Sequence, residues 1–140
     1  MSLTIYLHFN GNCREVFEFY RTVFGGEFES ISTFREGPDD MGVDEDALDQ
    51  VMHVAYPIGS SMLMGSDVPP PFSSSKVSGN NFSISYSAMS RDDADEVFGK
   101  LSDDGQVTMP LGEMFWGAYF GSCIDKCGIG WQVSMDASEN

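Results

Sequence analysis

Few side chains in this sequence suit acid–base or binding chemistry, and His53 is the first of them. It lies in the apolar stretch 51–58, where an imidazole could exchange protons near neutral pH or donate a hydrogen bond to a ligand. The other interpretation is a histidine whose ring nitrogens find backbone or carboxylate partners inside a sheet. His8, the second histidine, alternates with Leu7 and Phe9, so it faces a helix or solvent if those two face a ligand cavity. A metal site made of the two histidines alone would lack the third protein ligand that catalytic metal ions usually have.

Gln132 is the second candidate, and its neighbours indicate which way it points. It alternates with Trp131 and Val133, so it faces the open side of a strand if Trp131 packs beneath a helix. An amide there could orient a carbonyl or hydroxyl group of a ligand, although a pair of hydrogen bonds across the sheet explains it equally well. Trp116 stands in an aromatic cluster that is typical of a core, but an indole at a cavity rim can also stack on a ligand or a partner subunit.

Sulfur-containing side chains give a mixed signal. Several methionines suit either a filled core or an adaptable apolar pocket. These are Met52, Met62, Met64, Met109 and Met114. Cys13, Cys123 and Cys127 cannot all pair with one another, and a zinc site would need further ligands near them, so free thiols are expected. A helix start would lower the pKa of Cys13, but no base lies near it in the sequence, so a nucleophile is not expected. Asp125, before Cys127, is expected to order a tight turn.

The net charge of −15 is the strongest bulk feature of the chain. Such a surface repels phosphate backbones and anionic lipids, so neither nucleic acid nor a membrane surface is an expected partner. Acidity of this kind keeps a protein soluble, and the acidic stretch 36–49 is predicted to be a solvated, mobile loop. The sequence has no run of about 18 apolar residues and no secretory signal pattern at its first residues, so a cytoplasmic protein is expected.

The first element that must position these side chains is a helix over residues 13–24. Asn12 can cap its start, and Gly25 with Gly26 can end it with a left-handed turn. The residues of its apolar face are Val16, Tyr20, Val23 and Phe24.

A second helix is predicted to begin after Ser90. Ser90, with Asp93 three residues later, resembles a capping box with a shorter acid, and Gly105 closes the helix. Its apolar face comprises Ala94, Val97, Phe98 and Leu101.

Extended segments surround both helices and give the fold class. Strands are predicted over residues 3–9, 27–34, 51–58, 61–64, 82–88, 106–111, 116–124 and 130–135. The order β-α-β-β-β therefore occurs twice, which indicates an α+β fold of paired βαβββ modules. We expect a single domain with module one over 1–68, a proline-rich link over 69–78 and module two over 79–140. Two such sheets side by side, each covered by a helix on one face, would form a cup-shaped sheet with a concave surface.

Four segments in this order resemble a known family. They are residues 6–26, residues 52–54 with 62–67, residues 116–121 and residues 125–131. The resemblance is to PhnB-like proteins of the glyoxalase/bleomycin-resistance/extradiol dioxygenase superfamily, also called vicinal oxygen chelate. It covers nearly the whole chain and implies the fold, but the fold hosts isomerases, dioxygenases, lyases and antibiotic-sequestering proteins.

The resemblance also indicates where metal ligands would stand. Metal enzymes of the superfamily carry a ligand on the first and fourth strand of each module, and here those positions fall on Ile5, near Met64, near Ser83 or Ser85, and on Gln132. A catalytic divalent metal needs about three nitrogen or carboxylate ligands, which this set does not provide. No metal and no cofactor is therefore expected, and metal-dependent lyase or dioxygenase activity is not supported.

The resulting expectation is a small-molecule binding protein that lacks the usual metal site, with His53, Met64, Trp116 and Gln132 as candidate ligand-binding residues. The alternative is a glyoxalase- or dioxygenase-like enzyme with a non-standard metal or with His53 and Gln132 as acid–base and oxyanion groups. Relatives described as methyltransferases exist, but the sequence has no glycine-rich loop for that cofactor, and it has no P-loop, dinucleotide fingerprint, Gly-x-Ser-x-Gly or HExxH motif either. The resemblance further implies a homodimer.

Overall fold

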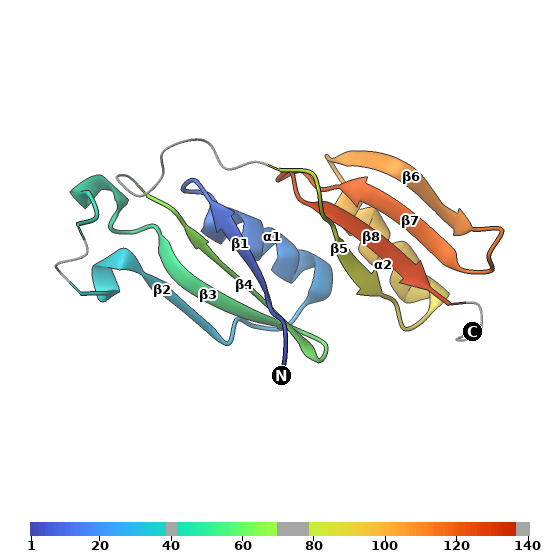
Figure 1. Cartoon of the computed structure of the whole chain (residues 1–140), viewed down its shortest axis with the longest axis horizontal. Coiled ribbons are helices and arrows are strands. Elements are labelled where there is room, and N and C mark those ends of the chain that lie inside the picture. Colours follow the sequence, from blue (N-terminus) through green and yellow to red (C-terminus); the bar gives the residue numbers. More distant parts are fainter. Residues whose placement is uncertain (39–41, 70–78, 137–140) are drawn as a thin grey trace. The chain divides into compact units, whose positions relative to one another are not determined.

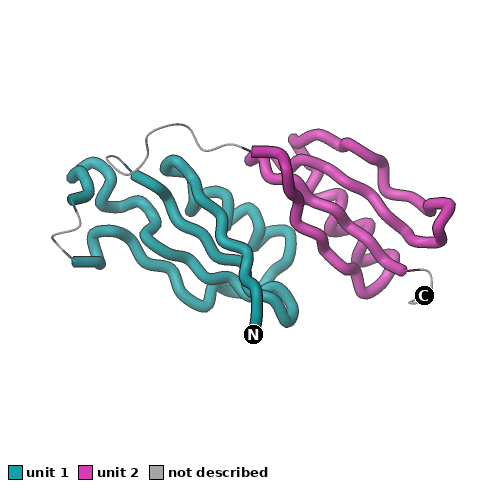
Figure 2. The backbone as a smooth tube through the Cα atoms, viewed as in Figure 1, with its two compact units in different colours: residues 1–77 teal, residues 78–140 magenta. Residues whose placement is uncertain are grey.

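The computed structural model describes residues 1–38, 42–69 and 79–136. The chain divides into two compact units, unit 1 over residues 1–77 and unit 2 over residues 78–140 (Figure 2). Within the described residues, each unit is a four-stranded sheet with an α-helix against one face (Figure 1). Whether the two units act as the single domain expected from the sequence stays a prediction.

Unit 1 consists of β1 (Ile5–Phe9), α1 (Cys13–Phe24), β2 (Ser30–Thr33), β3 (Val51–Ile58) and β4 (Ser61–Asp67). The strand order is β1-β4-β3-β2, with β1 parallel to β4 and the other pairs antiparallel. The helix α1 lies against β3 and β4, so one face of the sheet is covered and the other is left open.

Unit 2 repeats this plan with β5 (Ile84–Ser87), α2 (Arg91–Ser102), β6 (Gln106–Glu113), β7 (Tyr119–Ile124) and β8 (Gly130–Met135). Its order, β5-β8-β7-β6, matches that of unit 1 strand for strand, and again the first and last strands of the unit are parallel. The doubled βαβββ pattern and the α+β class predicted from the sequence are therefore confirmed.

The bounds of α1 agree with the prediction, but its N-terminus is capped differently. The Asn12 side chain makes no capping hydrogen bond. The buried Asp67 carboxylate accepts instead from the backbone N–H of Gly11 (2.8 Å), Cys13 (3.0 Å) and Val51 (2.9 Å). A carboxylate from the end of β4 is favoured there because the first N–H groups of a helix have no intrahelical acceptor. At the other end, Gly25 has a positive φ of 78°, as the turn predicted there requires.

The start of α2 follows the sequence pattern more closely. The Ser90 hydroxyl accepts from the Asp93 N–H at 3.0 Å. The Asp93 carboxylate does not complete a capping box, because it accepts from the Met89 N–H (3.0 Å) and the Tyr86 hydroxyl (2.8 Å). All four residues of the predicted apolar face are buried, and this face packs the helix against the sheet of unit 2.

Six of the eight strand predictions differ from the structure at one or both ends, and the differences in β2, β4 and β7 bear on the argument. The strand β4 continues to Asp67 because Leu7, His8 and Phe9 of β1 supply it with parallel partners. The strand β2 is shorter than predicted, since Phe34 begins a short 3-10 helix. Trp116 precedes β7 and lies in the turn between β6 and β7.

Two segments predicted as irregular are only partly described. The acidic stretch contains a 3-10 helix over Glu45–Ala47, and its Asp49 forms an exposed ion pair of 2.8 Å with Arg35, which precedes the stretch. Its residues 39–41, and residues 70–78 of the predicted link, lie outside the described residues. In the part of the chain that the structure covers, no helix has the length and apolar character needed to cross a membrane.

Candidate functional site

The open face of the unit 2 sheet carries a row of uncharged polar side chains. Trp131 and Val133 of β8 are buried on the side of α2, so Gln132 between them faces the opposite side, as the alternation predicted. Gln132 pairs with Ser85 of β5 and Ser122 of β7. The Ser122 hydroxyl in turn shares a hydrogen bond of 2.7 Å with Thr108 of β6. The row therefore crosses the whole sheet.

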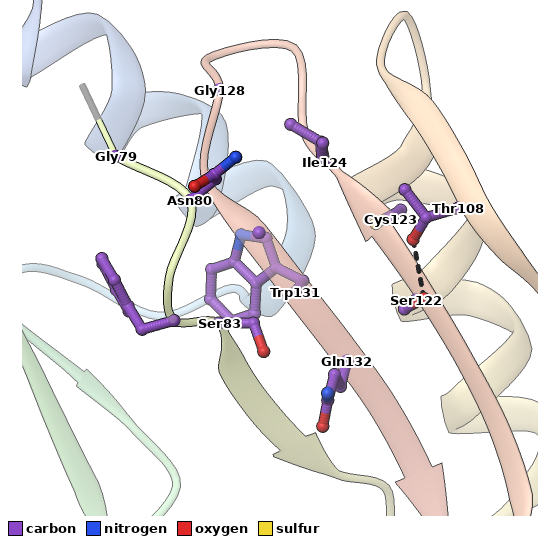
Figure 3. A pocket seen from close by; sticks show the side chains of 12 residues that line it. Gly79, Asn80, Ser83, Thr108, Ser122, Cys123, Ile124, Gly128, Trp131 and Gln132 are labelled. Carbon is purple, nitrogen blue, oxygen red and sulfur yellow. Dashed lines mark hydrogen bonds between the residues drawn. The ribbon is translucent and has the colours of Figure 1, made fainter.

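Part of this face is hollowed into a pocket of about 240 Å³, which we call the unit 2 pocket (Figure 3). Its polar lining residues are Asn80, Ser83, Thr108, Ser122 and Gln132, and the other lining residues are Phe82, Cys123, Ile124 and Trp131, together with three glycines. Among the lining residues drawn in Figure 3, the marked hydrogen bond joins Thr108 to Ser122, and none reaches the Gln132 amide. The amide can therefore bond to a molecule in the pocket.

The loop between β7 and β8 forms one wall of the pocket, and Asp125 holds it in place. The buried Asp125 carboxylate accepts from the backbone N–H of Cys127 (2.9 Å) and Ile129 (3.1 Å) through one oxygen. Its other oxygen accepts from the Trp131 indole N–H at 2.9 Å. The tight turn predicted at Asp125 is confirmed, and Gly128 completes it with a positive φ of 91°.

Charged side chains are missing from the lining of the pocket as far as the structure describes it. No Asp, Glu, Lys, Arg or His is among the described lining residues. Cys123 is the one described lining residue whose side chain is more acidic than an alcohol. Burial, and to a smaller extent the negative charge of Asp125, raises the pKa of its thiol to about 11. At neutral pH the pocket is therefore lined by neutral groups.

The open face of unit 1 carries a different group, Tyr6 with both histidines. The Tyr6 hydroxyl oxygen and His53 Nδ1 lie 3.2 Å apart, within hydrogen-bond distance. The Tyr6 ring centroid is 5.2 Å from that of His8 and 5.8 Å from that of His53. The sequence did not indicate Tyr6, because this contact joins residues 47 positions apart on β1 and β3.

From the sequence, His8 would face a helix or solvent if Leu7 and Phe9 faced a ligand cavity. The structure shows that they do not face a cavity. Leu7 and Phe9 are buried, and Phe9 contacts Phe17 of α1, so these two face the helix and not a cavity. His8 is consequently exposed on the open face beside Tyr6. Alternation fixes which residues share a face, but only packing against α1 decides which face is covered.

The four candidate ligand-binding residues do not form one cluster within a unit. His53 and Met64 lie on the open face of unit 1, where Met64 pairs with Tyr6. Gln132 lines the unit 2 pocket. Trp116 is 55% exposed in its turn, with ring contacts to Phe115 and Phe120, and it is not among the residues that line the pocket. Thr108 and Ser122, which do line it, were missed because their pairing depends on strand register.

Cys13 is unsuited to nucleophilic chemistry, as expected, but for a different reason. Its side chain is fully buried at the start of α1, and burial, with a smaller effect of the Asp67 carboxylate, raises the pKa of the thiol. A helix N-terminus would lower this pKa, but desolvation of the thiolate outweighs it.

The residues at the expected metal-ligand positions do not fit a divalent metal. Ile5 and Met64 carry no oxygen or nitrogen donor, and Ser83 and Gln132 offer only neutral oxygens. Elsewhere in the described ranges, no three His, Cys, Asp or Glu side chains are grouped as metal ligands would be.

Comparison with solved structures assigns the fold. The chain has a TM-score of 0.59 with a glyoxalase/bleomycin resistance protein/dioxygenase family enzyme from Burkholderia phytofirmans, with 93% of this chain and 95% of the other covered. At 13% identity this likeness concerns the fold alone. The protein therefore has the glyoxalase/bleomycin-resistance fold expected from the sequence.

Closer relatives assign the family. Protein PA1353 from Pseudomonas aeruginosa is 36% identical, with 96% and 98% of the two chains covered and a TM-score of 0.81. The PhnB protein from Bacillus cereus is 26% identical, with 96% and 99% covered and a TM-score of 0.76. Protein YjdN from Escherichia coli is 27% identical over 96% of this chain and 95% of its own length.

The profile of the family described as 3-demethylubiquinone-9 3-methyltransferase matches residues 1–134. The chain belongs to this family, and its similarity to the PhnB protein agrees with the PhnB-like resemblance found in the sequence.

Proposed function

We propose that the protein binds a small molecule in the unit 2 pocket and that no metal ion takes part. The observation that carries the proposal is the Gln132 amide, which points into the pocket beside the Ser122 and Thr108 hydroxyls without a bond to another lining side chain. Convergent polar groups in a concave, otherwise apolar site are typical of ligand recognition, because they fix the orientation of the bound molecule.

Binding accounts for the pocket better than turnover does. General acid–base catalysis needs a group whose pKa lies near the operating pH. The described lining offers only hydroxyls, amides and the Cys123 thiol, whose pKa burial raises to about 11. His53 belongs to unit 1 and is not among the described residues that line the pocket.

The test is a thermal-shift screen of small molecules followed by titration of the ligand that is found. Ligand at about 100 times its Kd should stabilise the folded protein by about 2.7 kcal/mol. Replacing Gln132 by Ala should weaken binding about tenfold, which corresponds to loss of one or two hydrogen bonds of about 1 kcal/mol each. Gln106→Ala is the matched control, because Gln106 is exposed at the start of β6 and does not line the pocket.

Two outcomes would contradict the proposal. Equal binding by Gln132→Ala and the unchanged protein would place the ligand elsewhere. Loss of binding on treatment with a metal chelator, with recovery on addition of a divalent ion, would show that a metal takes part.

We further propose that two copies of the chain associate, as the family resemblance implies. Several large apolar side chains of unit 2 are exposed in the single chain, which supports an apolar interface. They are Val107, Met109, Phe115 and Trp116. The mass of the protein in solution tests this proposal.

A further inference from the structure

We infer that the ligand of the unit 2 pocket is an uncharged small molecule that carries two or more hydroxyl groups, such as a polyol or a monosaccharide. The inference rests on the proposed function and specifies the chemical class of the ligand. Three observations support it. The described lining has no charged residue, the nearby Asp125 carboxylate is already hydrogen-bonded within its loop, and the remaining polar groups of the lining can both donate and accept hydrogen bonds.

The lining selects against charged ligands. Charged residues make up 21% of the sequence, yet the described lining contains none of them. An anionic ligand would find no Arg or Lys to pair with and would enter the field of a chain with net charge −15. A charged group placed in a pocket without a partner also loses hydration that nothing replaces.

A cationic ligand would lack a partner for a separate reason. Asp125 is the acid closest in sequence to the β7 and β8 residues of the lining, and its carboxylate already accepts from Cys127, Ile129 and the Trp131 indole. These bonds hold the wall of the pocket, so Asp125 cannot turn toward a ligand without loss of the loop conformation. A cationic ligand attracted by the acidic surface would therefore find no carboxylate to pair with among the described lining residues.

The hydrogen-bonding groups that remain match hydroxyl groups. Gln132 and Asn80 each offer an amide oxygen that accepts and an NH₂ group that donates, so either amide can bind two neighbouring hydroxyls. The hydroxyls of Thr108 and Ser122 can both donate and accept. Phe82, with 57% of its surface exposed, offers an apolar face for the C–H side of a ring. A volume of about 240 Å³ limits the ligand to a small molecule.

Trp131 permits a fluorescence measurement of binding, because it precedes Gln132 on β8 and its indole donates to Asp125 in the loop that forms one wall of the pocket. The chain has two tryptophans, and Trp116 lies outside the lining set. In Trp116→Phe, Trp131 is the single tryptophan, so a saturable change in fluorescence comes from the residue next to Gln132, and the Gln132→Ala variant shows whether the change depends on the pocket. This variant should be titrated with neutral monosaccharides and polyols, with phosphorylated and amino derivatives of each, and with apolar alcohols of similar size.

We expect at least one neutral polyhydroxy compound to bind, and its phosphorylated and amino derivatives to bind at least tenfold more weakly. Gln132→Ala in the same background should weaken the neutral compound about tenfold, and Gln106→Ala should leave it unchanged. Melting of each variant without ligand shows whether it is folded.

The outcomes separate this inference from the proposed function. If a charged derivative or an apolar alcohol binds best, and Gln132→Ala weakens it, the ligand class is wrong and the pocket still binds small molecules. If no compound of any of these classes changes Trp131 fluorescence or the melting temperature, the proposed function itself fails.

Discussion

At the scale of single residues, two buried aspartates organise the loops of the two units. Asp67 accepts from three backbone N–H groups around the start of α1 and β3, and Asp125 accepts from two backbone N–H groups and an indole beside the pocket. Both side chains are only 3% exposed. A carboxylate accepts through both of its oxygens, whereas an amide of the same size accepts through one oxygen only and donates from its NH₂ group.

Replacement of Asp67 by Asn should therefore destabilise the protein. The amide NH₂ would face backbone N–H donors and leave at least one of them without an acceptor, at a cost of about 2–4 kcal/mol in the free energy of unfolding. Urea denaturation followed by circular dichroism measures this change.

Asp49→Asn is the matched control for Asp67→Asn, because it removes the same charge from an exposed side chain paired with Arg35. It should change the urea midpoint little, since exposed ion pairs contribute little to stability. If the two variants shift the midpoint equally, net charge and not the buried hydrogen bonds would explain the effect.

At the scale of elements, the position of α1 on its sheet depends on Gly65 of β4. A Cβ atom at Gly65 would lie 2.7 Å from Phe17 Cε1 and 3.1 Å from the Leu7 carbonyl oxygen. Phe17 is fully buried and has ring contacts with Phe9 and Tyr20, so it has little room to move. The absence of a side chain at Gly65 therefore lets the helix approach the sheet closely.

Gly65→Ala should separate α1 from β4 and lower the free energy of unfolding by about 1–3 kcal/mol, as overpacking of a core usually does. The comparison variant is Gly112→Ala in β6, where a Cβ atom would meet nothing within 4 Å. Thermal unfolding should detect a lower melting temperature for Gly65→Ala alone. An unchanged melting temperature for Gly65→Ala would mean that Phe17 adapts without cost.

At the scale of the whole molecule, the net charge of −15 opposes the association of two copies. Repulsion between like-charged surfaces extends over about 30 Å at 0.01 M salt but over only about 8 Å at 0.15 M. An apolar interface with exposed aromatic side chains such as Trp116 would have to outweigh this repulsion.

We expect light scattering at 0.15 M salt to give about twice the chain mass of 15.4 kDa, and a larger fraction of monomer at 0.01 M. A monomer at 0.15 M would contradict the proposed dimer. A dimer that becomes tighter at low salt would instead contradict the argument from charge, because it would require attraction between the charged surfaces.

The sequence by itself determined the elements and their repetition. The apolar spacing of α1 and α2, the cap at Ser90, the turn at Gly25 and the doubled βαβββ order are local or periodic signals, so the sequence predicted them without knowledge of packing. The side occupied by Gln132 was also predictable, because its neighbour Trp131 is large and apolar enough to belong under a helix.

Tertiary structure decided the contacts that make the sites. The cap from Asp67 reaches Cys13 across 54 positions, and the contact between Tyr6 and His53 spans 47, so neither leaves a local pattern. Strand register brought Thr108 and Ser122 beside Gln132, and packing against α1 turned His8 to the open face. Alternation in a sequence gives the two faces of a strand, but only the partners across the sheet and the helix upon it determine what each face meets.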